Sequence, residues 1–243
     1  MIGVILAAGA GSRLKGTGGM DTCKPLLRVA QKPLITYSLD NLKKLGVQRA
    51  CIVVGRDGDA IRKTLGDVYQ GISLTYGEQK EQKGLIHGFV QGLAATGSEE
   101  TVILQLADEI LVGFDPERVL TAVRDTSYDF YCGIVGEENP EKIKGNYSVQ
   151  FDSAGNLLSC TEKPSVVTNT WKGTGFCIWR RNAQAFLRTN YDSACNQPGD
   201  LCEYMRRLLT EGYTGHVLTV AEKEYNINTP EDLAETERDC PIL

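Results

Sequence analysis

The sequence predicts a three-layer α/β/α domain built on a mainly parallel mixed sheet. The 243-residue chain opens on an unbroken apolar run, Ile2–Ala7, as expected of a strand that is buried on both faces. Similar short apolar runs recur at residues 50–54 and 101–106, and the segments between them carry apolar residues at helical spacing. Alternating strands and helices are typical of a parallel sheet that helices cover on both faces.

The first part of the chain follows this alternation. Residues 33–44 carry leucines at helical spacing, and Gly46 follows them, as it often follows a helix end. A polar loop with Asp57 and Asp59 then precedes a short helix to Leu65. We expect the next elements to be a strand at 72–76, a helix at 85–95 and a strand at 101–106.

One later segment departs from the parallel pattern. Tyr147, Val149 and Phe151 alternate with polar residues, residues 153–156 have the composition of a turn, and a second strand returns. This predicts an antiparallel hairpin inserted into the parallel fold. The elements predicted after it are a strand at 171–179, helices at 183–189 and 201–211, a strand at 216–220 and a helix at 230–239. The charged stretch 136–145 is assigned no element.

Composition argues against several classes of protein. A formal net charge of −5 with 42% hydrophobic residues predicts no general affinity for nucleic acids or anionic membranes. No apolar run approaches the roughly 20 residues that span a bilayer, and the first residues lack the features of a signal peptide, so we expect a cytoplasmic protein. The eight cysteines are scattered without a CxxC pair, which favours reduced structural thiols.

Two glycines stand directly after the first strand. Gly9 and Gly11 have no side chains, so backbone N–H groups there can approach an anion, as in a phosphate-binding loop. The stretch lacks the third glycine of the dinucleotide fingerprint, and the chain has no Walker sequence. Taken alone, the glycines fit a structural turn as well as a ligand site.

The residues around these glycines carry a family signature. LAAGAGSRL at residues 6–14, followed by CKPLL at residues 23–27, resembles the opening of the sugar-1-phosphate nucleotidyltransferases of the glucose-1-phosphate thymidylyltransferase type. The resemblance spans residues 1 to about 236. It implies a nucleotide-diphospho-sugar transferase-like (Rossmann-like) fold and an enzyme that joins a nucleoside triphosphate to a sugar 1-phosphate. The nucleotide-binding residues implied in this signature are Leu6, Ala7, Ala8, Gly9, Gly11, Ser12 and Arg13.

The chemistry of this reaction explains the two cations of the signature. A phosphate oxygen of the acceptor attacks the α-phosphorus of a triphosphate, so both groups are anionic and need neutralisation. We assign Arg13 to the β and γ phosphates and Lys24 to the α side as catalytic residues. The alternative is a pair of solvent-exposed side chains.

Two further residues are candidate ligands of Mg²⁺. Asp108 ends the buried strand VILQLAD, where ligands of α/β sheets bind. The resembling family carries a metal-binding Asp at this place, usually after a glycine, and here Ala107 replaces that glycine. Asn226, in YNINTPEDL, stands where the family completes the site. We expect one Mg²⁺ on Asp108, Asn226 and phosphate oxygens; the alternative for Asp108 is a helix cap.

The acceptor site is predicted from CTEKP and KGTGF. The family uses the matching Glu and Lys for sugar hydroxyls and for the sugar phosphate, which assigns Glu162 to substrate binding and Lys163 to both binding and catalysis. Gly175 matches a glycine of the sugar pocket, whereas Ser148 stands where a glycine is common, so the sugar can be atypical. The alternative for Glu162 and Lys163 is an exposed ion pair.

QKGLIHGF resembles the loop that reads the base and the helix after it. Gly84 would let backbone groups contact the base, and His87 stands where family members carry Gln or His. His87 fits a polar residue packed on the sheet equally well.

We expect one domain over residues 1–243, with the nucleotide in the half at about 1–110 and the acceptor in the half at about 111–243. The predicted partners are a nucleoside triphosphate and a sugar 1-phosphate, with no nucleic acid and no membrane. The sequence leaves open whether the chain forms a homo-oligomer. The alternatives are a cytidylyltransferase for a phosphocholine-like or phosphonate acceptor, a non-catalytic nucleotide-binding regulator, and, more remotely, a nicotinamide dehydrogenase.

Overall fold

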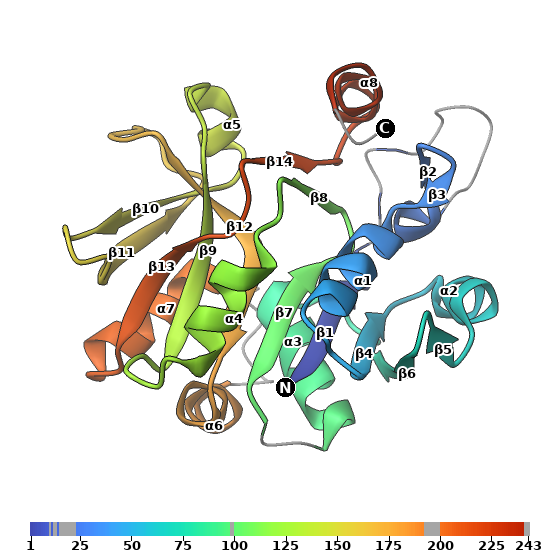
Figure 1. Cartoon of the computed structure of the whole chain (residues 1–243), viewed down its shortest axis with the longest axis horizontal. Helices are drawn as coiled ribbons and strands as arrows, with labels where there is room; N and C mark the ends of the chain where they lie inside the picture. The colour runs from blue at the N-terminus through green and yellow to red at the C-terminus, as the bar shows by residue number, and fades with distance from the viewer. Residues whose placement is uncertain (10, 12–13, 15–22, 98–99, 192–199, 241–243) are drawn as a thin grey trace.

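The computed structural model describes residues 1–9, 11, 14, 23–97, 100–191 and 200–240. At its centre is a ten-stranded mixed sheet in the order β11-β10-β12-β7-β1-β4-β6-β5, to which β9 and β13 are joined beside β12 (Figure 1). The strands of this sheet are β1 (Ile2–Ala7), β4 (Arg49–Val54), β5 (Val68–Tyr69), β6 (Ile72–Glu78), β7 (Val102–Leu106), β9 (Phe130–Gly136), β10 (Tyr147–Phe151), β11 (Leu157–Glu162), β12 (Trp171–Trp179) and β13 (Gly215–Thr219). Two smaller sheets pair β2 (Arg28–Val29) with β3 (Lys32–Pro33) and β8 (Glu109–Val112) with β14 (Lys223–Asn226).

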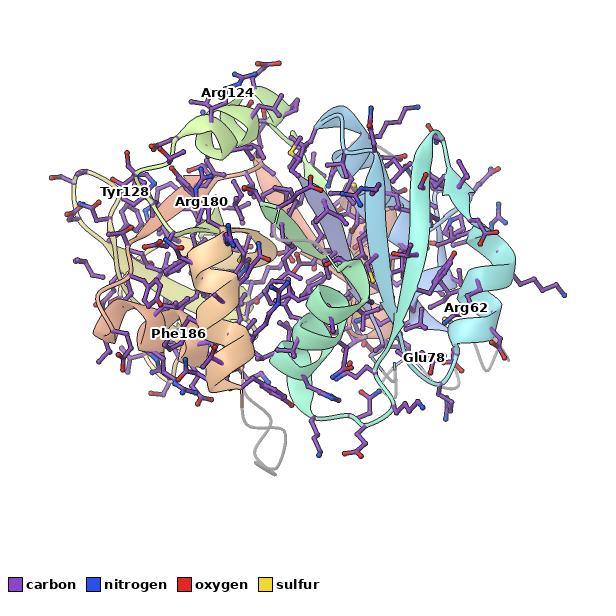
Figure 2. The ribbon with its side chains drawn as sticks, turned by 90° about the horizontal axis from the view of Figure 1, so that it is seen from below. Arg62, Glu78, Arg124, Tyr128, Arg180 and Phe186 are labelled. Atoms are coloured by element: carbon purple, nitrogen blue, oxygen red, sulfur yellow. The ribbon has the colours of Figure 1, made fainter. Side chains whose placement is uncertain are left out.

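Helices cover both faces of the large sheet. They are α1 (Ile35–Lys44), α2 (Gly58–Leu65), α3 (Gly84–Thr96), α4 (Pro116–Arg124), α5 (Pro140–Lys144), α6 (Arg181–Asn190), α7 (Leu201–Thr210) and α8 (Pro230–Asp239). Apolar side chains of α3, α6 and α7 pack on one face, and those of α1, α2 and α4 pack on the other. Figure 2 shows α4 on one side of the sheet and α3 and α6 on the opposite side. The three-layer α/β/α prediction is confirmed.

The first strands form the parallel part of the sheet. β1 lies between β4 and β7 and is parallel to both, so that Val4 is paired with Cys51 on one side and with Leu104 on the other. All three residues are fully buried. A strand with neighbours on both edges and helices on both faces has no solvent-facing side, which is why these strands are continuously apolar.

The later strands form the antiparallel part. β12 runs antiparallel to β7, β9 and β10, and β10 and β11 form the predicted hairpin with Tyr147 opposite Glu162. The hairpin turn is held by Asp152, whose Oδ1 accepts hydrogen bonds from the backbone N–H of Ala154 and Asn156 at 2.9 Å each. A short side-chain acceptor at a turn stabilises the backbone reversal.

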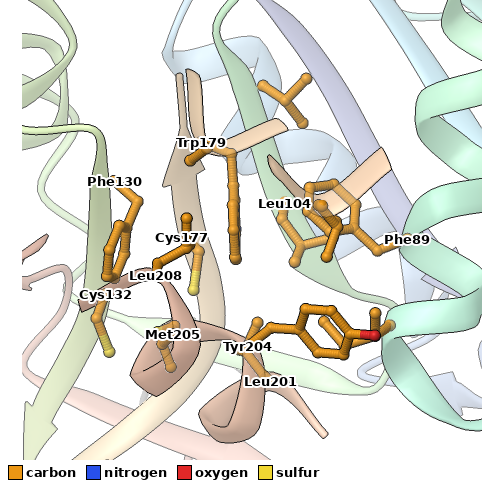
Figure 3. Close-up of a cluster of buried hydrophobic side chains, with 14 of the residues drawn as sticks. Phe89, Leu104, Phe130, Cys132, Cys177, Trp179, Leu201, Tyr204, Met205 and Leu208 are labelled. Carbon is orange, nitrogen blue, oxygen red and sulfur yellow. The ribbon is translucent and has the colours of Figure 1, made fainter. Parts of the chain in front are cut away.

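One core cluster joins the two parts of the sheet. Trp179 of β12 is fully buried, with its rings 5.2 Å from Phe89 of α3 and 5.8 Å from Phe130 of β9 (Figure 3). Aromatic side chains bury large apolar areas, so these contacts fix the antiparallel part against a helix of the parallel part.

Several elements had not been predicted. The strands β8, β9 and β14 and the helix α4 fall in stretches without an assignment, and the charged stretch 136–145 contains α5, whose first turn is capped by Asn139 Oδ1 accepting from Glu141 N at 3.0 Å. Among the described residues, no helix is long and apolar enough to cross a membrane.

Candidate active site

The end of β1 lies beside a small cavity at the carboxyl edge of the parallel strands. Ala7 and Ala8 are buried, whereas Gly9 is exposed. A Cβ at Gly55, after β4, would stand 2.8 Å from the carbonyl oxygen of Ala8, so only glycine allows this approach. Gln82 Nε2 donates to that same oxygen at 2.9 Å. The cavity measures about 160 Å³ and is lined by Ala7, Ala8, Gly9, Gly55, Arg56, Asp57 and Gln82.

The two ends of the signature meet in space. Gly11 has φ +56°, and a Cβ there would stand 3.1 Å from Cβ of Lys24, which begins the 3₁₀ helix η2 (Lys24–Leu26). Positive φ and a close neighbour both favour glycine at position 11. Leu6, at the end of β1, accepts a hydrogen bond from Ala107 N at 3.0 Å. Ser12 and Arg13 lie outside the described residues, so their assignments stay predictions.

Lys24, Asp108 and Asn226 belong to one polar network. Lys24 Nζ forms an ion pair with Asp108 Oδ2 and donates to Asn228 Oδ1 at 3.0 Å, and Asn228 Nδ2 donates to Asn226 Oδ1 at 2.8 Å. Pairing of β14 with β8 sets Asn226 opposite Glu109, and Ile227 N donates to the carbonyl oxygen of Asp108 at 3.0 Å. The structure therefore brings the two predicted metal ligands to the predicted catalytic lysine.

The donor set fits a hard cation. A carboxylate oxygen of Asp108 and the amide oxygen of Asn226 are ligands of the kind that Mg²⁺ takes alongside water and phosphate oxygens. In the described part of the chain, no three His, Cys, Asp or Glu side chains gather as a ready-made metal site. Two side-chain oxygens would leave the other positions around such an ion to water or to the oxygens of a bound phosphate, as is usual for Mg²⁺ in phosphoryl-transfer sites.

Buried charges lie behind this network. Lys172 Nζ is 2.6 Å from Glu224 Oε2 and 3.5 Å from Glu137 Oε2. Burial alone would lower the pKa of Lys172, but Glu224 and Glu137 outweigh it and raise that pKa. Burial also raises the pKa of Glu224. The backbone N–H of Gly175 donates one bifurcated hydrogen bond to Glu109, to Oε1 at 2.9 Å and to Oε2 at 2.8 Å. The pKa of Glu109 is raised well above the usual range by burial and then by Glu224.

Glu162 and Lys163 lie at the end of β11. The backbone of Lys163 is left-handed, with φ +45°, which is uncommon for a residue other than glycine. Its backbone N–H donates to Asn146 O at 2.7 Å. Its Nζ lies 3.9 Å from Glu162 Oε1, and the Lys163 side chain is 71% exposed. Burial and then Asp200, the N-cap of α7, raise the pKa of Glu162, and Lys163 opposes them.

A second cavity adjoins Asn226 and is bordered by residues of α5, β14 and α8. It measures about 340 Å³, and its lining includes Asn146, Lys172, Glu224, Asn226 and Asn228. Gly175 does not line it: a Cβ there would stand 2.2 Å from Leu106 Cγ and 2.9 Å from Glu109 Oε2, so this glycine allows close packing of β12 on β7 and β8. The assignment of Gly175 to the sugar pocket stays a prediction.

The residues predicted to read the base lie at the start of α3. Gly84 has φ +85° and begins the helix, and its carbonyl accepts from Gln79 Nε2 at 2.9 Å. His87 Nδ1 lies 2.9 Å from Glu81 O, and its ring stacks on Tyr191 at 5.9 Å. The base-reading roles of Gly84 and His87 stay predictions.

Residues of the site that the sequence reasoning missed are Gln79, Gln82, Glu109, Lys172, Glu224 and Asn228. A signal was available for Asn228, because side chains two residues apart on an extended chain share a face with each other. The pattern Asn226-Ile227-Asn228 therefore indicates two amides on one side. Lys172 and Glu224 gave no signal, since charged residues are usually exposed.

Comparison with known proteins gives the class of this protein. A family model described as nucleotidyl transferase matches residues 2–232. The chain belongs to this family, which confirms the resemblance of its opening residues.

Individual relatives carry more specific names. A UTP-glucose-1-phosphate uridylyltransferase of Haloferax volcanii is 28% identical over 246 residues, which are 98% of this chain and 96% of that protein. A glucose-1-phosphate thymidylyltransferase of Neisseria meningitidis is 30% identical over 197 residues, 80% of this chain and 66% of the relative. One of Mycolicibacterium smegmatis is 33% identical over 198 residues, again 80% and 66%. The chain thus matches only about two thirds of the length of the thymidylyltransferases.

Solved structures share the fold. A UDP-glucose pyrophosphorylase complexed with UDP-glucose superposes with a TM-score of 0.82 at 19% identity over 98% of this chain and 97% of that one. The inositol-1-phosphate CTP transferase of T. maritima gives a TM-score of 0.78 at 20% identity over 98% and 96%. Both likenesses confirm the nucleotide-diphospho-sugar transferase-like fold.

Proposed function

We propose that the protein is a Mg²⁺-dependent nucleotidyltransferase that joins a nucleoside triphosphate to a sugar 1-phosphate and releases pyrophosphate and an NDP-sugar. The observation that carries the proposal is the network of Lys24, Asp108, Asn228 and Asn226 beside the glycines that follow β1. It combines a cation for phosphate with oxygens for a metal, next to a backbone that an anion can approach. The names of the relatives support the choice of a sugar 1-phosphate.

The reaction needs charge neutralisation more than proton transfer. An oxygen of the acceptor phosphate forms a bond to the α-phosphorus, and the bond between the α-phosphorus and the bridging oxygen breaks as pyrophosphate leaves. The attacking phosphate is already anionic near neutral pH, so no general base is required. Mg²⁺ bound to Asp108 and Asn226 would supply positive charge to the triphosphate.

The side chains of this chain position the two anions. Lys24 is free to exchange its ion pair with Asp108 for the α-phosphate, and Arg13 would bind the β and γ phosphates. Lys163 would bind the acceptor phosphate and Glu162 the sugar hydroxyls. The nucleotide would lie over the half at about 1–110 and the acceptor over the half at about 111–243. The described cysteines are buried free thiols, which suits a reducing compartment such as the cytoplasm.

The test begins with the nucleotide. We would measure the melting temperature with ATP, GTP, CTP, UTP, dTTP and NAD, each with and without Mg²⁺, since a ligand at a hundredfold excess over its Kd stabilises the native state by about 2.7 kcal/mol. The stabilising triphosphate is then incubated with glucose 1-phosphate and with amino-sugar, phosphocholine and phosphonate acceptors, and pyrophosphate release is measured.

Two variants complete this test. Asp108→Asn should abolish the Mg²⁺-dependent part of the stabilisation and the release of pyrophosphate. Asp59→Asn, on the exposed side of α2, should change neither. Stabilisation by NAD alone would overturn the proposal, and turnover with phosphocholine but not with any sugar 1-phosphate would move it to the alternative acceptor class.

A further inference from the structure

Asn228 connects the two sides of the candidate active site. Its Oδ1 accepts a hydrogen bond from Lys24 Nζ at 3.0 Å, and its Nδ2 donates to Asn226 Oδ1 at 2.8 Å. Lys24 also forms an ion pair with Asp108. One amide therefore lies between the proposed catalytic lysine and the proposed metal-binding amide.

The chemistry of the partners fixes the orientation of both amides. The ammonium group of Lys24 can only donate hydrogen bonds, so the atom of Asn228 that faces it must be the oxygen. The NH₂ group of Asn228 then points at Asn226, and the atom of Asn226 that receives it must also be an oxygen. The hydrogen-bond network thus fixes the orientations of both amides, beginning from the positive charge of Lys24.

The backbone around Asn228 is held from two directions. Asp232 Oδ2 accepts from Asn228 N and Thr229 N at 2.8 Å each, and Ile227 N donates to Asp108 O at 3.0 Å. Thr229 and Asp232 form a capping box at the start of α8. Because these hydrogen bonds fix the backbone, the Asn228 side chain can still rotate only about its own bonds. Its hydrogen bonds with Lys24 and Asn226 restrict that rotation.

We propose that Asn228 is a positioning residue that makes the oxygen of Asn226, and not its NH₂ group, available to the cation at Asp108. The inference rests on the proposed function, in which Asp108 and Asn226 hold Mg²⁺. An amide has one oxygen and one NH₂ group, so a reversed Asn226 would present hydrogen-bond donors to a cation. A carboxylate has oxygens on both sides and needs no such control.

A double-mutant cycle read by metal binding tests this role. Free Mn²⁺ is titrated by electron paramagnetic resonance against the protein without nucleotide, because Mn²⁺ takes the same oxygen ligands as Mg²⁺. Asn228→Ala in the natural chain should weaken Mn²⁺ binding about tenfold, the usual effect of losing a partner of a metal ligand. In the Asn226→Asp background, the same change should weaken binding by less than about twofold, since a carboxylate binds in either orientation.

Controls separate positioning from folding. Asn182→Ala removes an exposed amide on α6 that donates to Asp129, and it should leave Mn²⁺ binding unchanged. If Asn228→Ala unfolds the chain, Asn228→Ser replaces it in the cycle, with melting temperature measured alongside. Equal losses in the two backgrounds, no loss in the natural chain, or Mn²⁺ binding that persists in Asp108→Ala would each overturn the inference.

The outcome is independent of turnover. If the protein releases pyrophosphate but Asn228→Ala weakens Mn²⁺ binding equally in both backgrounds, the proposed function stands and the role of Asn228 is overturned. A non-additive cycle in a protein that forms no NDP-sugar would support the role of Asn228 and overturn the proposed function.

Discussion

Two lysine-carboxylate ion pairs near β14 look alike in the sequence and differ in their surroundings. The side chains of Lys24 and Asp108 are 9% and 26% exposed, and Lys24 also touches Asn228 at the end of the parallel strands. The side chains of Lys172 and Glu224 are 4% and 0% exposed, and Glu137 encloses Lys172 further. The first pair can exchange its carboxylate for a phosphate, whereas the second cannot open without leaving a buried charge unpaired.

In the proposed function, solvent access to the carboxylate partner, and not the charge of the lysine, separates the catalytic Lys24 from the structural Lys172. Removing Lys24 should therefore affect the rate and spare the stability, and removing Lys172 should do the opposite. Substitutions at four positions test this contrast.

The largest effect is expected for Lys24→Met. Loss of a preorganised cation at the developing charge should lower the rate of pyrophosphate release about a thousandfold, as for the loss of one strong donor in an oxyanion site. The melting temperature should change little, because Asp108 is partly exposed and can be solvated. Lys43→Met, at an exposed position of α1, is the matched control and should keep full activity. If the rate of pyrophosphate release falls by less than tenfold, Lys24 is not a catalytic residue.

Lys172→Met should give the largest loss of stability. Breaking a buried ion pair from one side costs about 3–5 kcal/mol, and Lys172→Met combined with Glu224→Leu should recover a large part of it. The measurement is the free energy of unfolding from urea titrations.

The loss caused by Lys172→Met should also depend on pH. Burial raises the pKa of Glu224, and without Lys172 that folded-state pKa rises further above its unfolded value. A group of this kind stabilises the folded state below its unfolded pKa and loses that contribution as pH rises through the folded pKa. The deficit should therefore be larger at about pH 8 than at about pH 5. A deficit that grows on acidification would contradict the assignment of an unpaired buried carboxylate.

Asp232→Ala should have an intermediate effect, on both the stability of the fold and the binding of Mn²⁺. Loss of the capping box should cost about 1 kcal/mol. For a chain of this size, this corresponds to about 2–4 °C in melting temperature. Because Asp232 also holds the backbone of Asn228, Mn²⁺ binding should weaken as well. Glu237→Ala, at an exposed position of the same helix, should change neither quantity. If Asp232→Ala keeps both its melting temperature and its Mn²⁺ binding, the capping box of α8 does not contribute to the site.

The smallest effect is expected for Asp200→Asn. Burial and the charge of Asp200 raise the pKa of Glu162, so acceptor binding should weaken as pH falls and Glu162 takes up a proton. Removing the charge of Asp200 lowers the pKa of Glu162, and the acid limb of kcat/KM for the acceptor should move to lower pH. Asn is as good a helix cap as Asp, so α7 should stay intact. An unmoved acid limb would assign that limb to another group.

The reach of sequence reasoning differed between the two parts of the sheet. The bounds predicted for β1, β12 and α8 agree with the structure, because each has a strong local signal: an apolar run, or Thr, Pro and acidic residues at a helix start. β9 carries an apolar run of the same kind, but no strand is predicted there. β8 and β14, four residues each, are too short for periodicity to detect, and only their pairing defines them.

The fold class and the family could be read from the sequence, which also predicts the phosphate-binding end of the site, because hydrophobic periodicity and the opening signature are properties of neighbouring residues. Only the tertiary structure decided which lysine meets which carboxylate. Lys24 is 84 positions from Asp108 and 204 from Asn228, and strand pairing, not sequence spacing, brings them together. Burial likewise exists only after folding, so the enclosed pair of Lys172 and Glu224 could not be distinguished from an exposed one in advance.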